Sequence, residues 1–431
     1  MSLGPAVVVT TVIVGCEVVS NRRRRRKSPL PILKRLASFI KSSCPSITFP
    51  SHLSCLFLSH PINRPPSLSI HRLSSCLDLP ILTVPSTFFP FPSILIPYST
   101  PCHEAGIMAP SAEAASRVFS MPTSQYALTP GFYVPTVAFF TPQDTVDEVT
   151  TSTHAVRLAR AGVTGIVTHG SNGEAVHLDH QERSLITQLT RKALDNAGYT
   201  NMPIIVGCGA QSTRETIQLC KEAAEAGGSH VLILPPAYYG GLLTTDLIKA
   251  HFRAVADASP IPVLIYNFPA ACGGLDLSSD VVLDLAAHKN IQGVKLTCGN
   301  TGKLARIVAG TRGTDFRTFG GSADFTVQTL AVGGHGIIGG LGNVAPLACL
   351  EVFKRWEAGK QDSARELQEI VARGDWTAIQ GGFVSVKVAL QKYYGYGGEP
   401  RKPCAFPTGA RLAEQEKGFA ELVEAEKGLV K

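Results

Sequence analysis

Eight short apolar runs alternate with longer amphipathic stretches from Gly131 onward, and this alternation restricts the possible folds more than any other feature of the chain. The runs are nearly continuous in Val, Ile and Leu, which indicates strands buried on both faces, as in a parallel sheet covered by helices. Eight such repeats predict an α/β fold, a (β/α)8 TIM barrel, with a doubly wound sheet as the competing architecture. The predicted strands are 133–140, 165–169, 204–207, 231–234, 263–267, 293–296, 317–320 and 336–338.

Amphipathic stretches between these runs predict the barrel helices, and the chain after Pro346 becomes wholly helical. Asp179 and Ser212 precede two of the stretches and are expected to cap them. We therefore expect a lead-in at 108–130, a barrel at 131–358 and C-terminal helices at 359–431. The predicted helices include 146–161, 181–196, 213–226, 245–258, 347–357, 363–373, 377–392 and 411–427.

The first 107 residues differ from the rest in composition. They hold 14 of the 29 prolines and carry a net charge of +8, whereas residues 108–431 carry −1. Closely spaced prolines prevent long helices from forming, so no packed domain is expected there. Residues 21–76 are rich in Arg and Ser without an acidic residue, which resembles a mitochondrial transit peptide. An over-extended gene model is nevertheless the preferred interpretation, because an ordinary soluble sequence begins at Met108, and a basic nuclear address is a third alternative. The chain is expected to be cytoplasmic unless the segment is a transit peptide.

Charge and cysteine usage exclude several classes of function. The nearly neutral folded part argues against a nucleic-acid partner. The apolar run at 6–15 is too short to cross a bilayer, so no membrane anchor is expected. The 11 cysteines show no C-x-x-C pair and the histidines no H-E-x-x-H spacing. We therefore expect neither a disulfide framework nor a metal site.

Polar residues that follow the apolar runs are the candidates for chemistry, because a barrel carries its active site where the strands end. The second run is followed by Gly-Ser-Asn-Gly-Glu at 170–174, which indicates either an anion cradle or an ordinary turn. Lys295 lies inside the sixth run, and Tyr266 ends the fifth. Burial disfavours a charged lysine, and a neutral lysine amine can attack a carbonyl. A lysine, a phenol and an anion cradle are the parts of a Schiff-base enzyme for a 2-oxo acid.

At these residues the sequence resembles the dihydrodipicolinate synthase and N-acetylneuraminate lyase superfamily of pyruvate-dependent class I aldolases. The resemblance covers about residues 131–395. It implies that Ser171, Asn172 and Gly173 belong to the loop that binds the pyruvate carboxylate. It further implies that Lys295 forms the Schiff base and that Tyr266 moves protons for it. No cofactor is implied, because the imine itself accepts the electrons.

The resemblance also implies roles for two residues outside that group. Tyr239 matches a tyrosine that reaches into the neighbouring subunit's site in many members, so a homo-oligomer, dimer or tetramer, is expected, with Ser171 relaying protons between Tyr266 and Tyr239. Ile338 lies in a segment that resembles the eighth strand of the family and would offer its carbonyl near the site. That segment contains a formal G-x-G-x-x-G at 334–339. Because it spans a strand instead of following one, a dinucleotide site and a dehydrogenase are disfavoured.

One departure from the family bears on the substrate. Dihydrodipicolinate synthases carry an arginine two residues after the proline of Tyr-Asn-x-Pro, and Ala271 stands there in this chain. The sequence is more similar to 4-hydroxy-2-oxoglutarate aldolases and to fungal L-threo-3-deoxy-hexulosonate aldolases. The expected reaction is retro-aldol cleavage of a small 2-oxo acid to pyruvate and an aldehyde. A dihydrodipicolinate synthase-type condensation and a catalytically silent 2-oxo-acid-binding protein remain the alternatives.

Overall fold

The computed structural model describes residues 126–430, so the expectations for residues 1–107 and for most of the lead-in lie outside the described part. Eight parallel strands close into a barrel in the order β1 to β8, and β8 pairs with β1. The predicted TIM barrel is therefore confirmed, and the doubly wound sheet is excluded. The strands are β1 Gly131–Pro135, β2 Gly165–Thr168, β3 Ile204–Gly207, β4 His230–Ile233, β5 Val263–Asn267, β6 Ile291–Leu296, β7 Arg317–Gly320 and β8 Gly336–Ile338.

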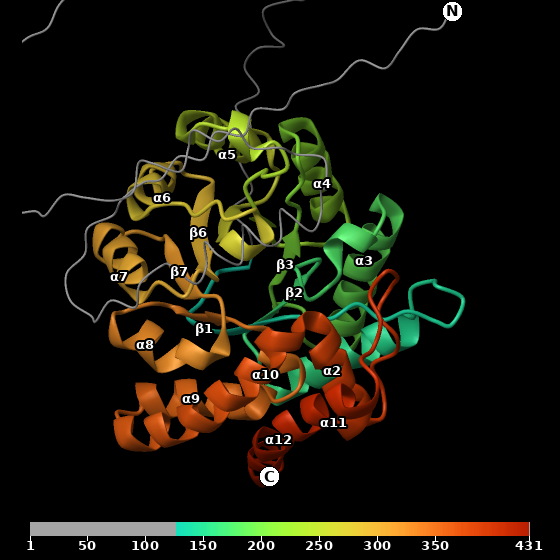
Figure 1. Ribbon diagram of the computed structural model, residues 1–431. Coiled ribbons are helices and arrows are strands. Elements are labelled where there is room, and N and C mark those ends of the chain that lie inside the picture. Colours follow the sequence, from blue (N-terminus) through green and yellow to red (C-terminus); the bar gives the residue numbers. More distant parts are fainter. Residues whose placement is uncertain (1–125, 431) are drawn as a thin grey trace, which may run out of the picture. The chain divides into compact units, whose positions relative to one another are not determined.

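Helices surround the barrel, and the C-terminal helices pack against one side of it (Figure 1). Asp179 and Ser212 cap α3 and α4 as expected, and Asp179 forms a capping box with Glu182. No helix in residues 126–430 is both long and apolar enough to span a membrane. The helices are α2 Glu148–Ala161, α3 His180–Asn196, α4 Thr213–Glu225, α5 Thr245–Ala258, α6 Ser279–Ala286, α7 Thr301–Gly310, α8 Thr326–Ala331, α9 Pro346–Glu357, α10 Gln361–Tyr394, α11 Gly409–Gly418 and α12 Ala420–Gly428.

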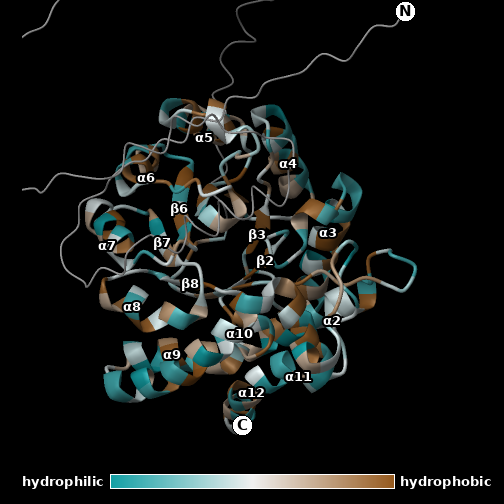
Figure 2. Ribbon diagram, in the orientation of Figure 1, coloured by the Kyte–Doolittle hydropathy of each residue, from teal (hydrophilic) through white to brown (hydrophobic). Residues whose placement is uncertain are grey.

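Apolar side chains fill both the barrel interior and the space between strands and helices. Hydrophobic residues concentrate on the strands, and hydrophilic residues lie on outward helix faces (Figure 2). This is the arrangement that near-continuous apolar strands predict, because each strand is covered on both faces. The interior cluster consists of Leu128, Tyr133, Val167, Ile205, Leu232, Leu264, Tyr266, Phe319 and Ile338.

The first predicted strand is too long, because β1 ends at Pro135 and not at residue 140. The apolar residues that follow are buried, but they leave the sheet to pack under the helices, and Phe140 forms only an isolated antiparallel bridge with Val146. Asn343 stabilises this exit by accepting a hydrogen bond from the Val137 N–H at 3.3 Å and donating one to the Pro135 carbonyl at 2.8 Å. Burial in a loop produces the same apolar run as burial in a strand.

The C-terminal helices break at different places from those predicted. α10 runs through the expected gap at 374–376 and is interrupted at Gly382, whose φ is 60°. Gly374 lies inside this helix, and its lack of a side chain allows α12 to pack closely, since a Cβ there would lie 2.6 Å from Leu422 Cδ2. The single helix predicted at 411–427 is two helices that meet at the fully buried Phe419. The Glu426 carboxylate accepts hydrogen bonds from two N–H groups in the first turn of α9.

Candidate active site

Lys295 and Tyr266 lie side by side on neighbouring strands. Their Cα atoms are register partners between β5 and β6. Val294 and Leu296 pack toward the helices, so the strand pleat turns Lys295 toward the barrel interior, where Tyr266 also lies. Lys295 Nζ is 4.3 Å from the centroid of the Tyr266 ring, and 3% of each residue is exposed. The structure thus brings together the amine and the phenol that the sequence placed at neighbouring strand ends.

A cavity of about 760 Å³ lies over these two residues. Its walls come from the β2–α3 loop, the ends of β5 and β6, the β7–α8 loop, the β8–α9 loop and α10. This is the carboxyl end of the barrel strands, where barrel enzymes carry their active sites. Lys295 is the one lysine or arginine among the described residues that line the cavity.

Ser171 and Asn172 from the β2–α3 loop line the same cavity. The hydroxyl oxygens of Ser171 and Tyr266 are 3.4 Å apart, a long hydrogen bond in which either group can donate. Within the described residues, the backbone N–H groups of Ser171 and Asn172 have no acceptor. Gly340 leaves room for the Asn172 amide, because a Cβ at residue 340 would lie 2.2 Å from its Nδ2. The loop offers a hydroxyl, an amide and two N–H donors, which together suit a carboxylate.

Three other predicted residues do not line the cavity in the single chain. Gly173 is buried beneath the loop, where a Cβ would lie 3.1 Å from the carbonyl oxygen of Thr136. Ile338 is fully buried in the barrel interior at the end of β8. Tyr239 is 66% exposed and packs edge-to-face on Tyr238, with ring centroids 5.0 Å apart. A role for these residues in the site remains a prediction.

The glycine-rich segment around β8 does not have the form of a dinucleotide-binding loop. β8 spans Gly336–Ile338, inside the G-x-G-x-x-G stretch at 334–339. A dinucleotide fingerprint instead follows a strand and opens a helix. The expectation that this stretch spans a strand is confirmed.

Sequence reasoning missed an acidic part of the cavity. Asp324 in the β7–α8 loop and Asp375 on α10 line it, together with Ser322. The Asp375 Oδ2 accepts hydrogen bonds from the Ser322 hydroxyl at 2.7 Å and from the Asp324 N–H at 2.9 Å. Burial raises the pKa of Asp375 to about 6 and also raises the pKa of Asp324. Ser322 and Asp324 follow the apolar run at 317–320, so the search for polar residues after each predicted strand could have found them. No feature of the helical sequence pattern indicated Asp375.

Glu174, the last residue of the predicted anion loop, contacts α10 instead of the cavity. Its buried carboxylate accepts hydrogen bonds from Lys387 Nζ at 3.0 Å and from the Arg401 N–H at 2.9 Å. His169 and Glu174, which flank the loop, have left-handed φ values of 55° and 51°. Such values are uncommon for residues other than glycine and persist where surrounding contacts hold them. Glu174 therefore anchors the loop that carries Ser171.

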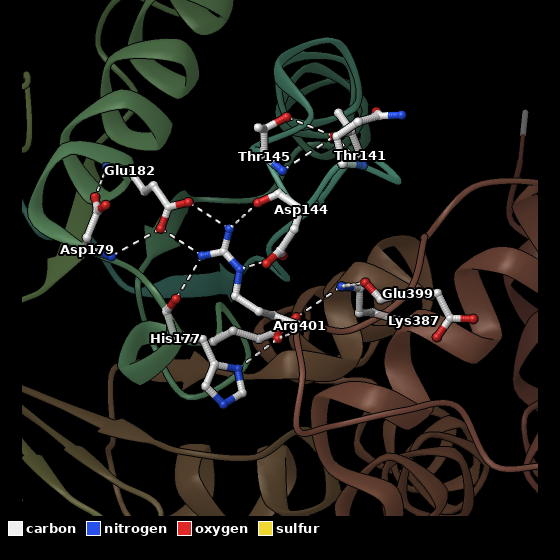
Figure 3. Close-up of polar contacts among 11 residues, drawn as sticks. Thr141, Asp144, Thr145, His177, Asp179, Glu182, Lys387, Glu399 and Arg401 are labelled. Atoms are coloured by element: carbon white, nitrogen blue, oxygen red, sulfur yellow. Dashed lines mark hydrogen bonds and ion pairs between the residues drawn. The ribbon is translucent and has the colours of Figure 1, made fainter.

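Arg401 extends this anchor to α3 (Figure 3). Its guanidinium forms two hydrogen bonds of 2.7 Å with the Glu182 carboxylate and one of 2.9 Å with Asp144 Oδ1. Hydrogen bonding to Glu182 is the largest cause that raises the pKa of Arg401 above its ordinary value. Arg401 also donates to the His177 carbonyl at 2.8 Å, while the nearby Lys387 donates to the Glu399 carbonyl at 2.8 Å. These contacts attach the chain after α10 to the loop beside the cavity.

Comparison with known proteins places the chain in a family. Residues 129–424 match the model of the dihydrodipicolinate synthetase family. The chain belongs to this family. A relative in Emericella nidulans named "Probable 4-hydroxy-2-oxoglutarate aldolase, mitochondrial" is 59% identical over 302 residues, covering 70% of this chain and 97% of the relative. The L-threo-3-deoxy-hexylosonate aldolase of Hypocrea jecorina is 46% identical over 307 residues, covering 69% and 98%.

Solved structures of the family share the fold. A dihydrodipicolinate synthase family protein from Coccidioides immitis is 36% identical with a TM-score of 0.64, and the match covers 70% of this chain and 98% of that one. A prophage protein of the dihydrodipicolinic acid synthase family from E. coli K12, solved in complex with pyruvate, is 27% identical with a TM-score of 0.64, covering 69% and 99%. The predicted family membership is therefore confirmed.

Proposed function

We propose that this chain is a class I aldolase that cleaves a 4-hydroxy-2-oxo acid or a 2-keto-3-deoxy sugar acid to pyruvate and an aldehyde. The observation that carries the proposal is the buried Lys295 amine beside Tyr266, in a cavity that also holds the Ser171–Asn172 loop. Two fungal relatives are named as aldolases for two such substrates, and these names support the same reaction.

In the proposed mechanism the substrate carboxylate binds to Ser171 and Asn172, and the Lys295 amine attacks the C2 ketone. Tyr266 donates its phenolic proton to the departing hydroxyl, so the carbinolamine loses water to give a protonated imine and Tyr266 becomes a phenolate. Tyr266 then takes the proton of the C4 hydroxyl, the C3–C4 bond breaks, and its electron pair moves into the imine to form an enamine while the aldehyde leaves. Protonation at C3 and hydrolysis release pyruvate and restore the amine. Ser171, 3.4 Å from the Tyr266 hydroxyl, relays protons.

Borohydride trapping tests this function against a silent binding protein. Incubation of the full chain with pyruvate and borohydride should add one reduced pyruvyl group, read by intact mass and mapped to Lys295 by peptide sequencing. An unmodified protein that still binds pyruvate would support the silent 2-oxo-acid-binding alternative.

A panel of substrates tests the reaction class. 4-Hydroxy-2-oxoglutarate, L-threo-3-deoxy-hexulosonate and N-acetylneuraminate would be offered separately, beside pyruvate with aspartate semialdehyde. One of the first two should give the highest kcat/KM. Ala271 provides no cation for the second carboxylate of the semialdehyde, and loss of a charge-assisted hydrogen bond costs about 1.5–3 kcal/mol. Dominant condensation with the semialdehyde would contradict the retro-aldol assignment.

We further propose that the enzyme is a homo-oligomer, dimer or tetramer, in which Tyr239 completes the neighbour's site. The exposure of Tyr239 and Tyr238, at 66% and 80%, supports this arrangement, because large exposed aromatic side chains are typical of interfaces. Sedimentation velocity of the full chain should give at least a dimer, and a fully active monomer would contradict the shared site.

The compartment depends on the segment before the barrel. We propose a mitochondrial location if residues 1–107 act as a transit peptide and a cytoplasmic one if they do not; the name of the Emericella relative supports the first. A fusion of residues 1–107 to a fluorescent protein would distinguish the two by microscopy. A chain that starts at Met108 should fold and react like the full chain, and insoluble protein would show that the segment is structural.

A further inference from the structure

The cavity has an uneven distribution of charge among its described residues. Lys295 is its one lysine or arginine, and in the proposed reaction that amine is consumed in the imine. Asp324 and Asp375 supply two carboxyl groups to the part formed by the β7–α8 loop and α10. The donors of the β2–α3 loop suit one substrate carboxylate, so a second carboxylate would find no basic side chain among these lining residues.

The two acidic residues are held in place by the fold. The Ser322 hydroxyl and the Asp324 N–H both donate to the Asp375 carboxylate. Gln368, about two turns before Asp375 on the same face of α10, donates to the Ala323 carbonyl at 2.9 Å and accepts from the Val327 N–H at 3.0 Å, which fixes α10 against this loop. These hydrogen bonds fix the Asp375 carboxylate, whereas Asp324 Oδ1 is buried and has no hydrogen-bond partner among the described residues. That oxygen is left to accept a hydrogen bond from a ligand.

The Asp324 and Asp375 carboxylates interact differently with the two candidate substrate classes of the proposed function. The hydroxyl groups of a sugar-acid tail can donate to carboxylate oxygens, whereas the distal carboxylate of 4-hydroxy-2-oxoglutarate has no proton to donate near neutral pH and carries the same charge. Gln328 and Ser322, which also line the cavity, can exchange hydrogen bonds with further hydroxyls. The lining is thus suited to an uncharged, hydroxylated tail.

Building on the proposed function, we infer that Asp324 and Asp375 make this aldolase select 2-oxo acids whose tail beyond the cleaved bond is uncharged and hydroxylated, as in a 2-keto-3-deoxy sugar acid. A tail that ends in a carboxylate is disfavoured by the same two residues. Asp324 and Asp375 are specificity-determining residues in this assignment, while imine formation is left to Lys295.

The test compares two substrates on the full chain at pH 7.5. Pyruvate release from L-threo-3-deoxy-hexulosonate should exceed that from 4-hydroxy-2-oxoglutarate by at least about tenfold in kcat/KM, the change that one well-placed polar interaction provides. Equal or reversed preference would overturn the inference. Borohydride trapping with pyruvate is measured first, because its failure would overturn the proposed function and not the assignment of the tail.

Conservative variants then separate specificity from structure. Asp324→Asn and Asp375→Asn each remove a charge and keep the shape, so each should narrow the ratio of the two kcat/KM values at least about threefold by improving use of the dicarboxylic substrate. Asp362 lies at the exposed start of α10, the helix that also carries Asp375. Asp362→Asn is therefore the matched control and should leave the ratio of the two kcat/KM values unchanged. If one variant fails to fold, the other still decides. An unchanged ratio in a folded variant that retains imine trapping would overturn the assignment.

Discussion

Two buried lysines in different regions of the molecule have different surroundings, and the proposed function gives them different roles. Lys387, on α10, is completely buried, forms a 3.0 Å ion pair with Glu174 and lies 5.0 Å from the ring centroid of Phe140. Lys295, at the end of β6, is 3% exposed and lines the cavity, and within residues 126–430 it has no carboxylate partner.

The two lysines differ in the groups that contact the amine. Burial lowers the pKa of Lys387, and the Glu174 carboxylate opposes this shift through its charge and its hydrogen bond. At Lys295 the Tyr266 ring is the contact that the structure provides. Lys387, paired with a buried carboxylate, holds elements together, whereas Lys295, beside a phenol in a cavity, is the amine to which the proposed function assigns the Schiff base.

Loss of the Lys295 amine tests whether this lysine forms the Schiff base, and it has the largest expected effect on turnover. Lys295→Ala should abolish imine trapping and lower turnover by roughly 10³-fold or more, because the substrate ketone loses its nucleophile. Intact-mass analysis after borohydride treatment measures the trapping, and circular dichroism checks the fold. Lys392→Ala, which removes a half-exposed lysine of α10, serves as the control. Persistent trapping in Lys295→Ala would place the Schiff base on another residue.

Removal of the Lys387 ammonium tests whether the ion pair with Glu174 stabilises the fold. Lys387→Met should lower the free energy of unfolding by about 3–5 kcal/mol, because Glu174 is left buried without its cation, and imine trapping should persist. Urea denaturation measures the loss. The partly exposed pair of Lys392 and Glu416 gives a matched control, and Lys392→Met should cost at most about 1 kcal/mol.

The double variant Lys387→Met/Glu174→Gln sharpens this second prediction. It should be less destabilised than the sum of the two single variants, because the carboxylate that needed the cation is also gone. Additive losses would show that Lys387 and Glu174 do not stabilise each other.

A buried carboxyl without a cation extends the comparison to the acidic side of the cavity. Burial raises the pKa of Asp375 to about 6 from an ordinary value near 3.8. Protonation of Asp375 therefore makes its full contribution to the free energy of unfolding below about pH 4, and this contribution is lost as the pH rises through 6. Between pH 4 and 8, Asp375→Asn should gain about 2–3 kcal/mol of unfolding free energy relative to the parent chain, as measured by urea denaturation at each pH. A difference that does not vary with pH would contradict the raised pKa.

The smallest effect is expected at an exposed residue. Tyr239→Phe should lower turnover by about tenfold, about 1.4 kcal/mol in activation free energy, without preventing imine trapping, because only a proton relay from the neighbouring chain is lost. Steady-state kinetics would be compared with Tyr238→Phe, which alters the adjacent phenol and should have normal turnover. Equal activity of both variants and the parent would remove Tyr239 from the proposed site.

Local sequence patterns were sufficient for the barrel and for the centre of the site. Strand ends of a parallel barrel converge, so a lysine and a tyrosine that end successive strands become neighbours whatever the loops between them contain. The register that pairs Tyr266 with Lys295, and the turn that brings Ser171 to Tyr266, follow from this rule. Boundaries were less predictable where apolar residues are buried outside strands, as after Pro135.

The sequence by itself determined the eight strands, the family resemblance and the amine, phenol and anion loop of the candidate site, because each depends on residues close together in the chain or on the symmetry of the barrel. Only the tertiary structure decided that α10 contributes Asp375 to the cavity and that Lys387 reaches Glu174 across 213 residues of sequence. Contacts of that separation depend on how the C-terminal helices dock on the barrel, and no local periodicity encodes the angle or position of docking.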